Sequence, residues 1–281
     1  MIDILIDSLI DTLKLLPYLF VTFIALEYLE HKLSKKNEKL LAKNKKYGPI
    51  IGGLLGGLPQ CGFSAMASNL FSSRVITIGT LIAVFLSTSD EMLPIMIGEK
   101  MSILSIINLI GFKIIIGIIV GLIIDLIYKG NNKKAGFEIH DMCEQEHCEC
   151  EHDGILLSSF KHTLKIGLFI LIANILISLI IYFIGEDELS KILLHKNILT
   201  YFASSLIGLI PNCASSVILT ELYISKFITI GNLLSGLLTG SGLGILLLFK
   251  TNKNIKENIA ILSIIYFVGV IVGIIVDLVY W

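Results

Sequence analysis

The chain repeats itself along most of its length. Residues 59–128 align without a gap to residues 211–280, and 22 of the 70 aligned positions are identical. The constant offset of 152 residues keeps polar and special residues in register as well as apolar ones: Pro59/Pro211, Cys61/Cys213, Gly117/Gly269 and Asp125/Asp277. Chance similarity between apolar segments would not preserve such pairs. Because a repeat of this size determines the whole fold, we expect two structurally equivalent halves.

Each half is dominated by apolar runs of membrane-spanning length. The runs 103–126, 166–184 and 259–279 are each close to the ~20 residues that a helix needs to cross a bilayer. Only 16% of residues are charged, against about 25% in ordinary soluble domains. A soluble protein with several buried helices would need more polar surface. The sequence therefore predicts an all-α polytopic membrane protein. Its expected partner is the lipid bilayer, and no binding of nucleic acid is expected.

The distribution of lysine predicts how the halves are oriented. Cytoplasmic loops carry an excess of Lys and Arg, so the basic segments 31–46 and 250–258 are expected inside. Their counterparts, 185–197 and 98–102, are acid-led or weakly charged and are expected outside. This is an inverted-topology repeat, as in many secondary transporters. We divide the chain into a first membrane repeat (1–128), a cytoplasmic His/Cys-rich linker (129–153) and a second membrane repeat (154–281), with both termini outside.

The number of spans in each half stays open. Segments 5–30 and 103–128 are expected to be full spans, and 75–97 is expected to be one longer helix. Segment 48–73 is expected to hold two short helices broken at Pro59. It is either a re-entrant hairpin beside three spans per half, or part of five spans per half and ten in total.

The broken helices point to a binding site. Proline has no N–H and disfavours helical geometry in the residue before it, so the backbone should open at Pro59, Gly62 and Pro211. Unwound backbone at membrane depth survives only inside protein or beside a wet cavity, and a symmetric pair of breaks marks a transporter's site. The alternative is a pair of kinks packed by small residues. The predicted ligands are Gln60, Cys61, Ser64, Asn212, Cys213, Ser216 and Glu221.

Acidic residues appear inside one predicted span. Asp90 and Glu91 lie in 75–97, where a charge costs at least ~2.5–3.5 kcal/mol and is functional by default. The counterpart of Asp90 is Gly242, so the second half carries no acid there. Lys113 lies mid-span opposite Ile265 and could pair with either acid, which would lower the burial cost of both charges. Alternatively, such a pair only holds helices together, or the acids reach the outer surface.

Two further patterns have simpler expected roles. The G-x-x-x-G pairs, Gly117/Gly121 and Gly269/Gly273, should let helices approach closely in lipid. Asp125 and Asp277 end their spans beside tyrosines and are expected to anchor them at the interface.

The linker concentrates metal-binding side chains. Thiolate and imidazole ligands suit zinc-like or cuprous ions, but the spacing is not that of a standard zinc finger, so we expect a flexible, exchangeable site. An inert acidic loop is the alternative. The expected ligands are His140, Cys143, His147, Cys148, Cys150 and His152.

Several of these motifs resemble a known family. "PQCGFSAMASNLF…ITIGTLIAVFLSTSDEMLPIMI", "HCECEHDGILLSSFKHTLKI" and "GLIPNCASSVILTELY…GSGLG" are similar to the bacterial ten-helix heavy-metal exporters, also labelled arsenic-efflux-like or manganese transporters. The resemblance covers nearly the whole chain. It implies metal or metalloid export across the bacterial inner membrane, with a core of Pro59, Gln60, Cys61, Ser89, Asp90, Glu91, Pro211, Asn212 and Cys213.

Together these features predict a secondary transporter that exports a transition-metal or metalloid ion. The metal is its substrate, no cofactor is bound tightly, and proton coupling is expected. A permease for a small organic solute and an uncoupled ion channel remain as alternatives, and a homo-oligomer is left open. No HExxH motif and no serine–histidine pair at membrane depth supports an enzyme.

Overall fold

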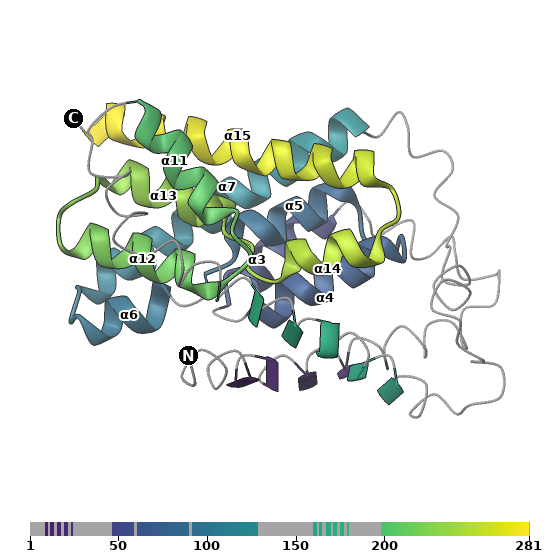
Figure 1. Cartoon of the computed structure of the whole chain (residues 1–281). Helices are drawn as coiled ribbons and strands as arrows, with labels where there is room; N and C mark the ends of the chain where they lie inside the picture. The colour runs from purple at the N-terminus through teal and green to yellow at the C-terminus, as the bar shows by residue number, and fades with distance from the viewer. Residues whose placement is uncertain are drawn as a thin grey trace.

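The computed structural model describes residues 47–58, 61–89, 92–128 and 198–280, with single positions inside 9–24 and 160–179. Regular structure in these ranges is helical throughout (Figure 1). The first half contains α3 (Gly48–Gly56), α4 (Cys61–Ser72), α5 (Ile78–Ser87), α6 (Met92–Gly98) and α7 (Ile103–Tyr128). The second half contains α11 (Leu199–Gly208), α12 (Cys213–Ile224), α13 (Ile230–Thr239), α14 (Gly244–Thr251) and α15 (Ile255–Tyr280).

The helix bounds follow the offset found in the sequence. Helices α4, α5 and α7 begin and end 152 residues before α12, α13 and α15, and the remaining pairs, α3/α11 and α6/α14, differ at one end by one residue. The break expected within 48–73 is confirmed, because α3 ends at Gly56 and α4 begins at Cys61. How the halves are oriented across the membrane stays a prediction from the lysine distribution.

The expectation of one long helix over 75–97 is wrong. Helix α5 ends at Ser87, and the backbone of Thr88 is extended, with φ −55° and ψ 129°. The hydroxyls of Ser87 and Thr88 bond back to the carbonyls of Ala83 and Val84, one turn earlier. Helix α6 then starts at Met92. Pro94 was the overlooked clue, since proline fits the first turn of a helix far better than its interior.

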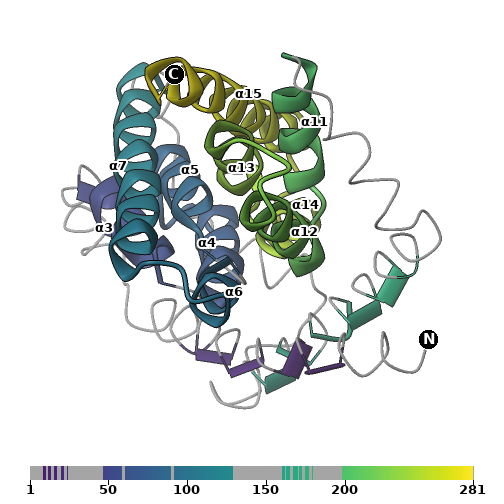
Figure 2. The same cartoon turned by 90° about the vertical axis from the view of Figure 1, so that its left-hand side faces the viewer.

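The two halves pack against each other through their central and short helices. Figure 2 shows the first half on the left and the second on the right, with α5 and α13 in contact between them. Helix α5 packs against α3 and α7, and α13 packs in the same way against α11 and α15. The short helices cross over, because α4 packs against α14 and α12 packs against α6. Each broken helix of one half therefore rests on the other half.

Close helix contacts rest on glycine in both halves, as the G-x-x-x-G pairs predicted. A Cβ at Gly121 would lie 2.5 Å from the carbonyl oxygen of Gly79, and one at Gly273 would lie 2.5 Å from that of Gly231. Only a residue without a side chain allows backbones to come this near. These contacts hold α7 on α5 and α15 on α13.

Asp125 and Asp277 make helix-capping contacts that the sequence did not predict, and their interfacial anchoring stays a prediction. The Oδ1 of Asp125 accepts a hydrogen bond from the Gly79 N–H at 2.9 Å, and the Oδ1 of Asp277 accepts one from the Gly231 N–H at 2.9 Å. Each carboxylate also accepts the hydroxyl of an N-cap threonine, Thr77 or Thr229. A carboxylate at this end satisfies orphan N–H groups and complements the helix dipole. The two aspartates thus cap α5 and α13.

Some of the described segments have the length and surface of membrane spans. Three segments are long and apolar enough to cross a bilayer: Ile103–Tyr128, Ile230–Thr251 and Ile255–Val279. The outer face of α7 leaves Ile103, Leu104 and Leu126 about 70% exposed. Such an exposed apolar face suits lipid and not water. The chain is an all-α, multi-pass membrane protein.

Candidate transport site

The first-half break meets the second half at α14. Ser64, in the first turn after the break, is fully buried, and a Cβ added at Gly244 would lie 2.8 Å from the Ser64 Cβ. One turn further, the Ser68 hydroxyl donates a hydrogen bond to the Gly244 carbonyl at 2.7 Å. The start of α4 therefore lies beside the interruption between α13 and α14. Two breaks that are far apart in sequence are brought together.

The second-half break is stabilised by a serine. The Ser215 hydroxyl donates to the carbonyl of Asn212 at 2.8 Å and lies 3.3 Å from that of Ile210. These carbonyls flank Pro211, where the chain leaves α11. Asn212 itself is 8% exposed. A short polar side chain thus supplies the hydrogen bonds that an interrupted helix loses.

Lys113 lies where the two central helices end. Its side chain is 1% exposed, and its Nζ donates to the carbonyls of Thr88 and Leu237, the latter at 2.8 Å. Thr88 is the C-cap of α5, and Leu237 is in the last turn of α13. Helix C-termini carry partial negative charge, so they favour a cation. The structure therefore places one buried lysine nitrogen between the carboxyl ends of α5 and α13.

Three buried polar side chains have no hydrogen-bond partner among the residues that the structure describes. Both amide atoms of Asn69 on α4 are unpaired, and so are the hydroxyls of Ser204 on α11 and of Ser241 in the α13–α14 interruption. All three side chains are fully buried. An unpaired buried polar group costs about 1–3 kcal/mol, so it calls for a functional or hydration-based explanation.

The predicted site residues fall into three groups. Ser64, Gly62 and Asn212 are buried, whereas Pro211 and Ser216 are partly buried. Glu221 is exposed on α12, which separates it from the buried members. Cys61 and Cys213 are the first residues of α4 and α12, but their side chains lie outside the described part. Pro59, Gln60, Asp90, Glu91 and the whole linker, with His140, Cys143, His147, Cys148, Cys150 and His152, also lie outside the described residues.

No group of three His, Cys, Asp or Glu side chains comes together within the described ranges. The side chains of the proposed thiol ligands, the two central acids and the linker lie outside the described part of the chain. The predicted pairing of Lys113 with Asp90 or Glu91 therefore stays a prediction.

Sequence reasoning missed the partners that organise this centre. The carbonyls of Thr88 and Leu237 could not be found from residue type, since any residue carries a carbonyl. The N-cap threonines Thr77 and Thr229 could have been found, because "ITIG" is identical in both halves. Each threonine lies 48 residues before an aspartate that is also repeated at the offset of 152.

Apolar helices of spanning length and paired helix breaks define a multi-pass membrane protein with a central interrupted region. Residues 1–186 match the family described as "Putative, 10TM heavy-metal exporter". This match covers about two thirds of the chain, and the chain belongs to that family. No curated protein and no solved structure matches it.

Proposed function

We propose that this protein is a secondary transporter that exports a transition-metal or metalloid ion across the bacterial cytoplasmic membrane. The observation that carries the proposal is the crossed packing of broken helices, in which α4 rests on α14 and α12 rests on α6. This arrangement brings interrupted backbone from both halves into the protein centre. Interrupted helices at equivalent positions are where secondary transporters bind their substrates.

The lengths of the short helices support re-entrant segments. Helix α3 has 9 residues and α4 has 12, so at 1.5 Å per residue they extend about 14 and 18 Å. A hydrocarbon core is about 30 Å thick. Neither helix could cross it alone, which favours a pair that enters and turns back at Pro59. The family description counts ten spans, and five membrane-embedded segments per half would give that number.

The proposed ligand set joins soft and hard donors. Cys61 and Cys213 begin α4 and α12, and the thiols would suit a soft or borderline metal ion. Ser64 and Asn212 would add oxygen ligands, with Gln60 and Ser216 beside them. Asp90 and Glu91 would supply negative charge from the α5–α6 interruption. Glu221 is left out of this set because its side chain is exposed.

The buried lysine supports a charge-coupled cycle. A cation that enters the centre meets Lys113, already held at the carboxyl ends of α5 and α13. Two positive charges in low dielectric repel strongly, so an acid that binds either the metal or a proton would be needed nearby. Asp90 is the proposed acid, and this makes proton-coupled export the favoured mode.

Flux through purified protein in sealed vesicles tests this proposal. Mn²⁺, Fe²⁺, Zn²⁺ and arsenite should be compared, each with and without a pH gradient. We expect flux of at least one ion that a pH gradient accelerates. Ion flux that does not depend on the pH gradient would favour an uncoupled channel. Flux of organic solutes alone would favour a permease.

Thiol labelling locates the site independently of flux. The transported ion should protect both Cys61 and Cys213 from a membrane-permeant thiol reagent. Equal labelling of Cys61 and Cys213 with and without every ion tested would count against a site between the two breaks.

A further inference from the structure

A pocket of about 410 Å³ opens between the two halves on one side of the centre. It is lined by α6 and α7 from the first half and by α12, α13 and α15 from the second. Its lining residues include Met101, Asn108 and Tyr223, with Leu234 on the inner wall. Leu234 lies one turn of α13 before Leu237, whose carbonyl binds Lys113. The pocket therefore extends from the surface toward the central charge.

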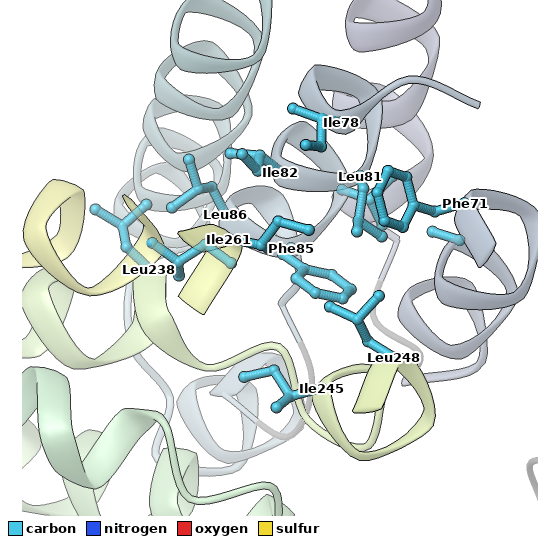
Figure 3. Close-up of a cluster of buried hydrophobic side chains, with 13 residues drawn as sticks. Phe71, Ile78, Leu81, Ile82, Phe85, Leu86, Leu238, Ile245, Leu248 and Ile261 are labelled. Carbon is cyan, nitrogen blue, oxygen red and sulfur yellow. The ribbon is translucent and has the colours of Figure 1, made fainter. Parts of the chain in front are cut away.

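The same positions in the other repeat form packed core. Of the ten pocket-lining residues, seven have counterparts, 152 residues away, that belong to one apolar cluster or pack directly on it. Figure 3 shows this cluster, with Phe71, Ile82, Leu248 and Ile261 arranged around Phe85. These four are at most 2% exposed. Eight of the ten pocket-lining residues themselves belong to a second apolar cluster or pack on it. Apolar packing is therefore present on both sides of the pseudo-symmetric molecule, and the pocket is a hollow beside one of the two clusters.

Side-chain size explains part of the difference. Phe85 is fully buried in the filled cluster, and its counterpart near the pocket is the smaller Leu237. Phe71 is 2% exposed, whereas its counterpart Tyr223 is partly exposed in the pocket lining. At this position one side therefore has a ring and the other has a smaller aliphatic side chain, while Phe112 and Tyr223 contribute rings to the pocket lining.

A polar latch ties the halves together on the filled side. Arg74, after α4, donates two hydrogen bonds to the Glu257 carboxylate on α15, at 2.9 and 3.0 Å. The amide of Asn252 also donates to Glu257 at 3.0 Å. The counterparts of Arg74 and Glu257 are Lys226 and Ser105, which cannot form an ion pair. The latch therefore exists on one side only.

We propose that the pocket is the open vestibule through which the transported ion reaches or leaves the centre, and that the symmetry-related vestibule is closed here by the Phe85 cluster and the Arg74–Glu257 latch. This rests on the proposed transport function. Met101 lies in the segment expected outside and Glu257 in one expected inside, so the open vestibule would face outward. Transport would exchange the open and closed sides.

The chemistry of the open vestibule suits release of a cation. None of its ten lining residues carries a charge. Ser105, Asn108 and Tyr223 offer neutral oxygen atoms, and Met96 and Met101 offer thioethers, which are soft but weak ligands. A hydrated divalent or soft ion could pass these groups without meeting the counter-charge that would retain it.

Matched cysteine substitutions at repeat-related positions test the assignment. Leu234 in the vestibule wall and Ile82 in the closed cluster are counterparts, and both are almost fully buried. Leu234→Cys and Ile82→Cys variants are exposed in detergent to a charged thiol reagent, and peptide mass spectrometry distinguishes each new cysteine from the native ones. We expect Leu234→Cys to react about tenfold faster, because the reagent can reach this position through the pocket, whereas Ile82→Cys needs local opening.

Breaking the Arg74–Glu257 latch should make the closed side more accessible to the thiol reagent and the open side less accessible. Arg74 and Glu257 are 26% and 20% exposed, and a pair this accessible contributes up to about 1 kcal/mol, so Glu257→Gln should raise Ile82→Cys labelling about two- to fivefold. Leu234→Cys labelling should fall at the same time. Arg74→Gln should act in the same way, and the reversed pair Arg74→Glu with Glu257→Arg should restore the original pattern.

Equal labelling rates of the two matched cysteines would overturn the vestibule assignment. Latch variants that raise both labelling rates by the same factor would also overturn it, because they would indicate general loosening of the protein. Metal flux is measured separately on the unaltered protein. Absent flux with asymmetric, latch-dependent labelling would count against the metal-transport function and leave the vestibule assignment standing.

Discussion

The side-chain nitrogen of Lys113 donates a hydrogen bond to the backbone carbonyl of Leu237 at 2.8 Å, across 124 positions of sequence. Lys113 belongs to α7 of the first half, and Leu237 belongs to α13 of the second. The same ammonium group also bonds to the carbonyl of Thr88 at the end of α5. One buried lysine therefore connects both central helices. Its counterpart Ile265 has no side-chain donor and cannot make such hydrogen bonds.

Replacement of this lysine should destabilise the protein. Lys113→Met keeps the length of the side chain but leaves the carbonyls of Thr88 and Leu237 without this donor, which costs about 1–3 kcal/mol. Thermal unfolding in detergent measures the effect. Ile265→Met is the matched control, because a volume-conserving apolar swap should cost less than about 1.5 kcal/mol. Equal losses from the two variants would show that the hydrogen bonds of Lys113 contribute nothing.

Asp90→Asn tests the proposed coupling acid. The amide keeps the size of the side chain and removes its charge, so the metal loses compensation in low dielectric. We expect insertion into the membrane to persist and metal efflux to be lost. If Lys113 pairs with Asp90, adding Lys113→Ile should recover folding without recovering transport. Efflux at the unaltered rate under limiting and saturating metal would exclude Asp90, and Glu91 would become the candidate.

The cap on α13 can be tested by a double-mutant cycle. The Tyr201 hydroxyl donates to the Asp277 carboxylate at 2.7 Å, beside the bonds from Thr229 and Gly231. Tyr201→Phe should lower the free energy of unfolding by about 1 kcal/mol in the unaltered protein. In an Asp277→Ala background the same change should have almost no effect, because the acceptor is gone. Additive losses would mean that Tyr201 acts independently of the cap.

Glycine contacts predict a large difference between two Gly→Ala changes. A Cβ at Gly79 would lie 2.1 Å from the backbone oxygen of Gly121, whereas one at Gly111 would meet no atom within 4 Å. Backbone cannot yield as a flexible side chain can, so Gly79→Ala should cost about 1–3 kcal/mol or more. Gly111→Ala should be neutral or stabilise the helix by up to about 1 kcal/mol. Similar melting temperatures for the two variants would contradict the close approach of α5 and α7.

The linker should matter for metal capture more than for translocation. Replacing Cys143, Cys148 and Cys150 with Ser removes its thiolates but alters neither membrane repeat. We expect weaker metal binding by equilibrium dialysis, with metal flux in vesicles partly retained. A complete loss of flux in a well-folded variant would place the linker within the transport pathway.

Sequence alone was sufficient for the repeat and for the bounds of the long helix α7. Proline, glycine and aspartate kept a single register at an offset of 152, and α4, α5 and α7 follow it without deviation from their counterparts. The span 103–128 and the break between α3 and α4 were predicted correctly, because long apolar runs and proline act through local backbone physics. The interruption between α5 and α6 was missed, since its cause includes a hydroxyl-bonded turn and an extended Thr88.

The contacts between distant segments, and between the two halves, could be known only from the tertiary structure. No periodicity indicates that Ser68 binds the Gly244 carbonyl, that Asp125 caps a helix 46 residues earlier, or that Arg74 pairs with Glu257. Equivalent sequences could have packed equivalently on both sides, yet a pocket of about 410 Å³ lies beside one apolar cluster, and the other cluster is built around the ring of Phe85. Local sequence determines where a helix starts and breaks, whereas backbone carbonyls, long-range caps and side-chain volumes act only once distant segments are in contact.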